Sequence, residues 1–194
     1  METLKMHQER AIDKYSRLLK AGAKVIHEQG FHRTLLADIA REAEVPQGSI
    51  YYYFKTKDDI AEAIINERIS SLGKLTKKLD AYTNPKKRLY ALIKVWVDDR
   101  EIDSRYGCPI GSLCNELAKN RGLLCDTSAE QLRVLVDWCE LQFRELNKPV
   151  RQARDFAVHL ICALQGVSLL ANAFGDAEVI LREANQLKRW VKDL

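Results

Sequence analysis

The sequence predicts an all-α protein with a small N-terminal helical head and a larger helical body. Apolar residues recur three and four positions apart along most of the chain, which is the period of an α-helix. Only 9 glycines and 4 prolines occur among 194 residues, so there are few positions at which a helix must end. We find no run of alternating apolar and polar residues of the kind that predicts a strand.

The first two helices of the head follow from periodicity and capping residues. Apolar positions indicate a first helix over about residues 10–29, and Gly30 is a natural C-terminal stop. Thr34 offers a side-chain cap for a second, short helix, and Asp38 would lie in its opening turn. This helix is expected to end at Ala43.

A third helix follows after a tight turn. Glu44 and Val45 form the turn, and Pro46 has the fixed backbone angle that suits the beginning of a helix. The helix is expected to extend to about Tyr53. Two short helices joined by a turn of three or four residues form a helix-turn-helix.

The rest of the chain predicts further helices and a domain boundary near residue 57. The head would comprise residues 1–56 and the body residues 57–194. The helices expected in the body cover residues 57–81, a segment opened by Asn84 and Pro85, and residues 113–119, 128–147, 152–174 and about 177–192.

Composition limits the classes of protein. The chain is 46% hydrophobic and 30% charged, as folded globular proteins are, and its formal net charge of +4 is too small to indicate a polyanionic partner by itself. The first ten residues carry scattered charges and no apolar core, so we expect no signal peptide and a cytoplasmic protein.

The five cysteines do not have the spacing of a metal or redox site. No two of them are separated by two residues, and their number is odd. We therefore expect reduced thiols, no metal and no cofactor. These cysteines are Cys108, Cys114, Cys125, Cys139 and Cys162.

One segment is long and apolar enough to suggest a membrane span. Residues 156–175 contain no Lys, Arg, Asp or Glu, and about twenty apolar residues are needed to cross a bilayer. Polar side chains interrupt the segment at His159, Gln165, Ser168 and Asn172. Since polar groups are costly against lipid, we interpret it as a soluble helix that packs on its own core with one face and on a partner subunit with another.

Three consecutive tyrosines, Tyr51–Tyr53, distinguish the third helix. Aromatic residues at helical spacing usually belong to a core, but three in succession span about 200° of a helix and cannot all face one core. Ile50 and Phe54, four apart, are expected to face inward. At least one tyrosine must then face outward, where its hydroxyl could reach a phosphate oxygen.

The residues around the tyrosines suit the major groove of DNA. In a helix-turn-helix the second helix enters that groove. Gln47 could pair with adenine, Ser49 could donate to a base or a phosphate, and Gly48 would allow close approach of the backbone. Lys55 and Lys57 would attract phosphates.

The segment of residues 30–60, GFHRTLLADIAREAEVPQGSIYYYFKTKDDI, resembles the DNA-binding region of the TetR family of bacterial transcriptional repressors. The resemblance implies a homodimer that reads a palindromic operator in double-stranded DNA, and a C-terminal body for dimerisation and for binding a small-molecule effector. It places Thr34 near a phosphate, and Lys57 at the beginning of the helix that connects head and body. The recognition helix would contain Gln47, Gly48, Ser49, Tyr51, Tyr52 and Tyr53.

The sequence departs from the family pattern at three positions. Leu35 stands where a hydroxyl residue is usual, Glu44 replaces the usual turn glycine, and Pro46 stands where a serine cap is common. Each change removes a small phosphate or cap contact.

The segment YGCPIGSLCNEL, residues 106–117, resembles one found in a subset of these repressors, some of which respond to electrophiles or oxidants through a cysteine. Cys108 would lie just before a helix, whose N-terminus lowers a thiol pKa and favours the thiolate. The alternative is that Cys108 and Cys114 are small buried hydrophobic residues.

The resemblance also suggests residues for a ligand pocket and a dimer interface. His159 could instead be a histidine satisfied within the core. The expected pocket residues are Trp96, Cys108, Ile110, Trp138, Phe143, His159 and Cys162. The last two long helices would form a four-helix bundle with their symmetry mates. The residues expected to meet across it are Val158, Ile161, Leu169, Ile180, Leu187 and Trp190.

Two other functions remain open on sequence grounds. One is an effector-independent architectural or occlusion protein that binds DNA on the same scaffold. The other is a thiol-dependent enzyme, although no local motif joins Cys108 to His159 as nucleophile and base. We expect a regulator and no enzyme.

Overall fold

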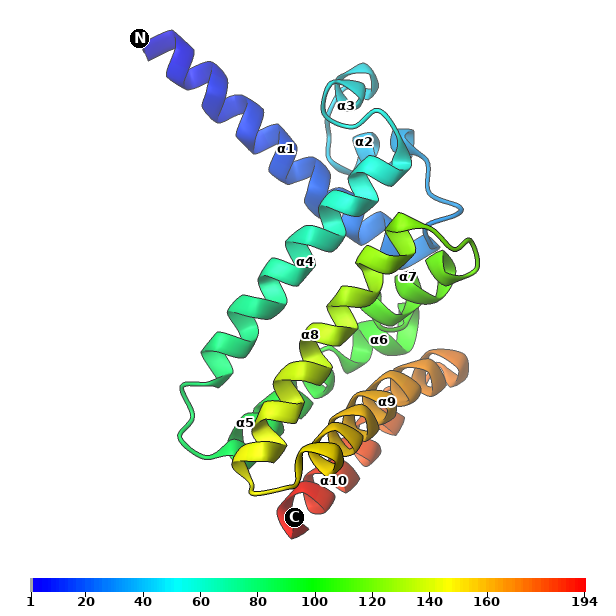
Figure 1. The fold of residues 1–194 in the computed structure, drawn as a ribbon. Helices are drawn as coiled ribbons and strands as arrows, with labels where there is room; N and C mark the ends of the chain where they lie inside the picture. Colours follow the sequence, from blue (N-terminus) through cyan, green and yellow to red (C-terminus); the bar gives the residue numbers. More distant parts are fainter. Residues whose placement is uncertain (1) are drawn as a thin grey trace. The chain divides into compact units, whose positions relative to one another are not determined.

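The computed structural model describes the backbone of residues 2–194 and the side chains from residue 8 onward, and the described chain is helical with no strand (Figure 1). The all-α prediction is confirmed. The helices are α1 (Glu2–Gln29), α2 (Leu36–Glu42), α3 (Gln47–Tyr53), α4 (Lys57–Leu79), α5 (Pro85–Asp98), α6 (Arg100–Tyr106), α7 (Pro109–Ala118), α8 (Leu123–Glu145), α9 (Val150–Phe174) and α10 (Glu178–Asp193).

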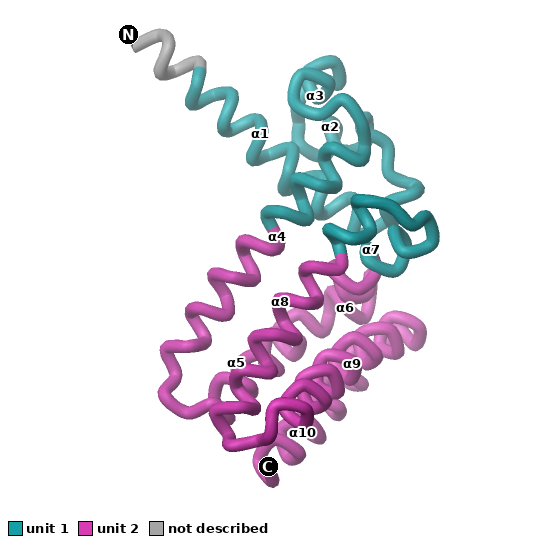
Figure 2. The backbone as a smooth tube through the Cα atoms, viewed as in Figure 1, with its two compact units in different colours: residues 1–67, 113–128 teal, residues 68–112, 129–194 magenta. Residues whose placement is uncertain are grey.

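The chain forms two compact units, which Figure 2 shows in different colours. Unit 1 comprises residues 1–67 and 113–128, and unit 2 comprises residues 68–112 and 129–194. The boundary expected at residue 57 therefore differs from the observed division. One reason is that Ile60 and Ile64 of α4 lie against Gly22 of α1, so the beginning of α4 shares the core of unit 1.

The second helix begins one residue later than a Thr34 cap would allow, because Leu35 occupies the N-cap position. Asp38 reaches back to accept a hydrogen bond from the Leu35 backbone N–H at 3.0 Å, and this bond is the main cause that holds the pKa of Asp38 below its usual value. Thr34 is fully buried, and its hydroxyl donates to the carbonyl oxygen of Gly30 at 2.7 Å. The prediction that Thr34 caps α2 is wrong.

The turn between α2 and α3 contains an unusual backbone conformation. Glu44 has φ of +52°, in the left-handed region that favours glycine. The guanidinium of Arg17 on α1 donates to the carbonyl oxygens of Ala43 at 2.5 Å and Glu44 at 3.1 Å, which ties the turn to α1. Pro46 is the N-cap of α3 and provides no side-chain cap, as its identity predicts.

Helix α7 begins earlier than the sequence predicts. The helix expected over residues 113–119 is α7, and it begins four residues earlier at Pro109, because proline is well suited to the first position of a helix. Gly111 permits close packing against α9 within unit 2. A Cβ atom at this position would lie 2.1 Å from Oε1 of Gln165.

The core of unit 2 is made by one face each of α5, α8, α9 and α10. On α9 the buried residues are Ala153, Ala157, Leu160, Ile161, Leu164, Val167, Ser168 and Ala171. By length and composition α9 could cross a membrane, yet 39% of its most apolar window is buried inside the protein. Its opposite face leaves Val158, Leu169, Leu170 and Phe174 exposed.

Candidate nucleic-acid interface

The recognition helix α3 is anchored by few side chains and leaves most of its surface free. Ile50 is fully buried, and Phe54, the residue that follows the helix, is also buried. Gln47, Gly48 and Tyr51 are exposed. The inward direction expected for Ile50 and Phe54 is therefore the one observed.

The three tyrosines of α3 differ in their exposure and in their contacts. Tyr53 is half-buried and packs near Tyr15 of α1, with 6.2 Å between ring centroids. Tyr52 is 80% exposed and stands against the edge of Tyr53, with centroids 5.2 Å apart. Tyr51 is 47% exposed. Two aromatic side chains thus project from α3, and a third fixes the helix to α1.

The two lysines after α3 make hydrogen bonds within unit 1. Nζ of Lys55 donates to the carbonyl oxygen of Tyr51 at 2.7 Å, at the C-terminal end of α3. Nζ of Lys57 donates to the carbonyl oxygens of Phe31 at 2.8 Å and His32 at 3.0 Å, and it lies 4.6 Å from the centre of the Phe31 ring. The Lys57 ammonium, expected to attract phosphate, is therefore held by the protein itself.

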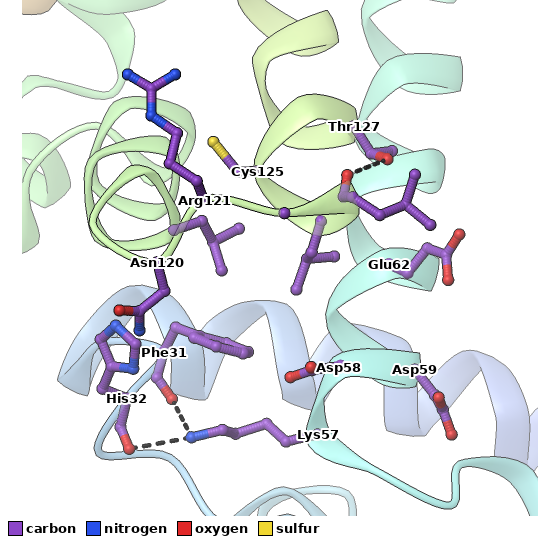
Figure 3. A pocket seen from close by; sticks show the side chains of 14 residues that line it. Phe31, His32, Lys57, Asp58, Asp59, Glu62, Asn120, Arg121, Cys125 and Thr127 are labelled. Carbon is purple, nitrogen blue, oxygen red and sulfur yellow. Dashed lines mark hydrogen bonds between the residues drawn. The ribbon is translucent and has the colours of Figure 1, made fainter.

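A cavity of about 590 Å³ lies beside these contacts in unit 1. Figure 3 shows Lys57 reaching the Phe31 and His32 carbonyl oxygens at its edge. Carboxylates in the first turns of α4, leucines of α7 and α8 and the connection between these two helices complete its wall. None of the residues that the sequence suggests for a ligand pocket lines this cavity.

Comparison with known proteins determines the class of the helix-turn-helix. Residues 18–64 match the family model described as bacterial regulatory proteins, tetR family. The helix-turn-helix is of the tetR family. The matched residues include the whole of α2 and α3.

Relatives of the chain are described as transcriptional regulators. The HTH-type transcriptional regulator BetI of Serratia proteamaculans is 38% identical over 90 residues, which cover 45% of this chain and 46% of that protein. The chain thus matches about half of the length of BetI. An uncharacterised HTH-type transcriptional regulator of Lactococcus lactis is 29% identical over 180 residues, 89% of this chain and 90% of that protein.

A solved structure shows that the likeness of fold extends beyond the tetR-family helix-turn-helix. A TetR transcriptional regulator from Chloroflexus aurantiacus superposes with a TM-score of 0.83 over 95% of this chain and 96% of its own. The two are 16% identical in sequence, so the comparison establishes the fold alone.

Thr34 does not have the exposure that a phosphate contact requires. The side chain of Thr34 is fully buried within the tetR-family helix-turn-helix region, and its hydroxyl is used by Gly30 and Gln29. The expectation that Thr34 lies at a phosphate is therefore corrected: its role is to order the connection between α1 and α2. Ser49 is half-buried.

The residues expected to line a ligand pocket are not brought together. Trp96, Trp138 and Phe143 are buried in the core of unit 2. His159 and Cys162 are exposed on α9, because they follow the outward side of a helix whose other face is buried. They cannot line a cavity within that core. Ile110 is half-buried on α7.

The two buried tryptophans differ in how their polar atoms are satisfied. The indole N–H of Trp138 donates to Oδ1 of Asp80 at 2.9 Å. The indole N–H of Trp96 is buried and has no hydrogen-bond partner among the described residues. A buried donor without an acceptor costs about 1 to 3 kcal/mol.

Cys108 does not have the electrostatic environment of a reactive thiol. It is buried, and burial raises the pKa of Cys108, although the backbone of Gly111 and the amide of Gln165 oppose this shift. The sequence predicted a lowered pKa at the N-terminus of a helix, and desolvation outweighs that effect. The structure thus favours the interpretation of Cys108 as a buried structural thiol.

Of the six residues expected at a dimer interface, three are buried, two are exposed and one is half-buried. Ile161, Ile180 and Leu187 are buried in the core of unit 2, so their side chains are already used within one subunit. Val158 and Leu169 are exposed. Trp190 is half-buried among the rings of Phe143, Phe156 and His159.

Sequence reasoning missed a buried carboxylate in unit 2. Asp103 of α6 is buried, and Oδ2 accepts a hydrogen bond from the Ser168 hydroxyl of α9 at 2.8 Å. Burial raises the pKa of Asp103 to about 6, with Asp99 adding to the shift and Ser168 opposing it. No periodicity identifies this residue, because α6 is short and polar. In the described residues no group of three His, Cys, Asp or Glu side chains could hold a metal ion.

Proposed function

We propose that the chain is a cytoplasmic, dimeric transcriptional repressor that binds a palindromic operator and is released by a small molecule. The observation that carries the proposal is the exposed face of α3 within a tetR-family helix-turn-helix. An amide, a glycine and two tyrosines are available there, and these groups suit base edges and phosphates. The residues proposed to contact DNA are Gln47, Gly48, Ser49, Tyr51 and Tyr52.

Two lysines and one tyrosine make contacts within unit 1 that hold α3 and its neighbouring segments in place. Tyr53 anchors α3 through Tyr15, and Lys55 closes its C-terminal end through Tyr51. Lys57 holds the connection between α1 and α2. We therefore propose that Tyr53 and Lys57 position the recognition helix, and that Lys55 can still reach a phosphate because its side chain is exposed.

The partner that covers α9 is proposed to be a second copy of the chain. Leu169 is 68% exposed and Phe174 is 67% exposed on the outer face of α9. Exposed apolar groups of this size on a soluble protein indicate an interface. A shallow groove of about 470 Å³ lies between α9 and α10 and includes Leu170 and Val179. Two copies of α3 mounted on one such dimer could engage successive major grooves, about 34 to 36 Å apart.

The effector is proposed to bind in unit 2, at Trp96. An acceptor atom on the ligand would satisfy the buried indole N–H, and the neighbouring core supplies an apolar wall. An electrophilic effector that reacts with Cys108 is not supported, because burial raises the pKa of this thiol. The same observation argues against a thiol-dependent enzyme.

Replacement of Tyr52 by alanine tests the role of α3. Duplexes would first be selected in vitro from a random pool with the wild-type protein. Tyr52→Ala should weaken binding to the selected duplex by about tenfold, the loss expected for one phosphate or base contact, without changing the melting temperature. Tyr82→Ala is the control, because Tyr82 is an exposed tyrosine that lies outside the helix-turn-helix. Equal affinities of all three proteins would refute the contact.

A further inference from the structure

Two adjacent peptide groups between α1 and α2 are held by a carboxylate from far along the chain. The backbone N–H groups of Phe31 and His32 donate to Oε1 and Oε2 of Glu116, each at 3.1 Å. Glu116 lies on α7, 85 residues after Phe31 in the sequence, and both segments belong to unit 1. Both carboxylate oxygens are thus used on a single turn of backbone.

The carbonyl oxygens of the same two residues are held by a cation. Nζ of Lys57 donates to both oxygens, at 2.8 and 3.0 Å. The peptide group between Phe31 and His32 therefore has a negative charge at its N–H and a positive charge at its C=O, which is the favourable orientation for the dipole of this peptide. We call Phe31, His32, Lys57 and Glu116 the 31–32 clamp.

Gly30 leaves room for the contact between Glu116 and the backbone of Phe31 and His32. Its φ is +86°, and a Cβ atom there would lie 3.0 Å from Oε1 of Glu116. A side chain at position 30 would thus be strained by its backbone angle and would crowd the carboxylate. Glycine allows Glu116 to approach the N–H groups that follow.

The 31–32 clamp joins residues that come before and after the helix-turn-helix in the sequence. Residues 32 and 57 are 25 positions apart, and α2 and α3 both lie between them. Joining these positions fixes the two ends of the recognition module to each other. Glu116 adds a third segment, and the helix that carries it begins in unit 2, since residues 109–112 of α7 belong to that unit.

We propose that Glu116 is a positioning residue for DNA binding, through which the state of α7 sets the orientation of the recognition helix. The inference rests on the proposed function. Each hydrogen bond to a charged group is stronger than a neutral one, and the 31–32 clamp contains four of them. Loss of Glu116 frees two backbone donors and loosens one end of the module, while the buried anchors of α3 remain in place.

Hydrogen exchange and duplex binding together test the proposal. Glu116→Ala should weaken binding to the selected duplex by at least about tenfold, and the Glu116→Gln variant, whose amide oxygen can still accept one bond, should fall between. The salt dependence of binding should keep its slope, because no phosphate contact is lost. Exchange at the amides of Phe31 and His32 should become faster in both variants.

Linkage supplies a measurement that a merely structural role would not change. If α7 and α3 are coupled, bound duplex must slow exchange in residues 113–118 of the wild-type protein, and this response must vanish in Glu116→Ala while the slowing at α3 persists. Two controls match the substitution: Asn115→Ala changes the exposed neighbour on α7, and Glu62→Ala removes an exposed carboxylate of unit 1. Both should behave as wild type.

The outcomes separate the two proposals. Affinity of Glu116→Ala within twofold of wild type, or a response of residues 113–118 that survives in this variant, would overturn the role of the 31–32 clamp and leave the proposed function intact. If the wild-type protein selects no duplex at all, the proposed function itself fails.

Discussion

Helices α3 and α9 both leave apolar or aromatic side chains exposed, but they are supported in opposite ways. On α3 the buried Ile50, the half-buried Tyr53 and the following Phe54 hold the helix, and most of its remaining surface is exposed. On α9 eight residues are buried, and exposed apolar side chains occupy the other face. The orientation of a short helix with few buried residues depends strongly on the contacts that flank it, whereas a long helix with a fully buried face is held along its length. The two helices thus suit a reader of DNA and a platform for dimerisation.

Replacing Leu169 by glutamate should have the largest effect, because it disrupts the exposed apolar face of α9 that we propose as the dimer interface. A carboxylate would have to be desolvated in an apolar contact between subunits. We expect the protein to sediment as a monomer at micromolar concentration, and its affinity for a palindromic duplex to fall at least about 100-fold because two-site binding is lost. Leu141→Glu is the matched control, since Leu141 is exposed on α8 and should tolerate the change. A Leu169→Glu protein that stays dimeric would place the interface elsewhere.

A smaller effect should come from replacing Asp103, whose carboxylate accepts a hydrogen bond from Ser168 on the buried face of α9. Burial raises the pKa of Asp103 from 3.8 to about 6, so between these values the folded state keeps a proton that the unfolded chain releases. This contribution to stability is complete below the unfolded pKa and is lost as pH rises through the folded pKa. From pH 5 to 7.5 the wild-type protein should lose about 1 kcal/mol that Asp103→Asn does not lose.

Urea unfolding of both proteins at the two pH values measures this difference. The amide introduced by Asp103→Asn is neutral at either pH and could still accept a hydrogen bond from Ser168. The two proteins therefore differ in the charge at position 103 and not in this hydrogen bond. A stability difference between the two proteins that does not depend on pH would contradict the assignment.

The smallest effect should come from the turn that leads into α3. Glu44 has a left-handed backbone, which costs a residue with a side chain about 1 to 2 kcal/mol, and glycine would lose part of this gain through its greater freedom when unfolded. Glu44→Gly should therefore stabilise the protein by about 0.5 kcal/mol, measured by urea unfolding. Glu42→Gly, at the last residue of α2, should destabilise it by about 1 kcal/mol, because glycine is a poor helix former and the ion pair of Glu42 with Lys24 is lost. Two changes of the same sign would contradict this explanation of the turn.

The same contrast explains what the sequence could and could not predict. Geometry predicted that at least one of the three tyrosines is exposed, because three successive residues of a helix cannot share one core, and Tyr52 is the most exposed of them. The inward direction of Ile50 was expected from its spacing with Phe54. On α9 apolar residues lie on most sides of the uncharged segment, so the pattern did not distinguish Ile161, which is buried, from Leu170 and Phe174, which are exposed. Hydrophobicity predicts a direction only where polar residues mark the other side.

Contacts between distant segments were beyond the reach of any local pattern. Glu116 and Lys57 hold the same backbone segment, but one lies on α7 and the other on α4. The sequence assigned Lys57 to phosphate attraction because of its positive charge next to the recognition helix. Asp103 and Cys108 likewise owe their raised pKa values to burial, which no neighbour in the sequence reveals.

The mass of the protein on its selected duplex, measured by sedimentation at several duplex lengths, tests the central claim most directly. The account predicts two subunits on one palindromic site, with the half-sites about one helical turn apart and with loss of specific binding when a half-site is removed. A single subunit bound with equal affinity to unrelated sequences would contradict it.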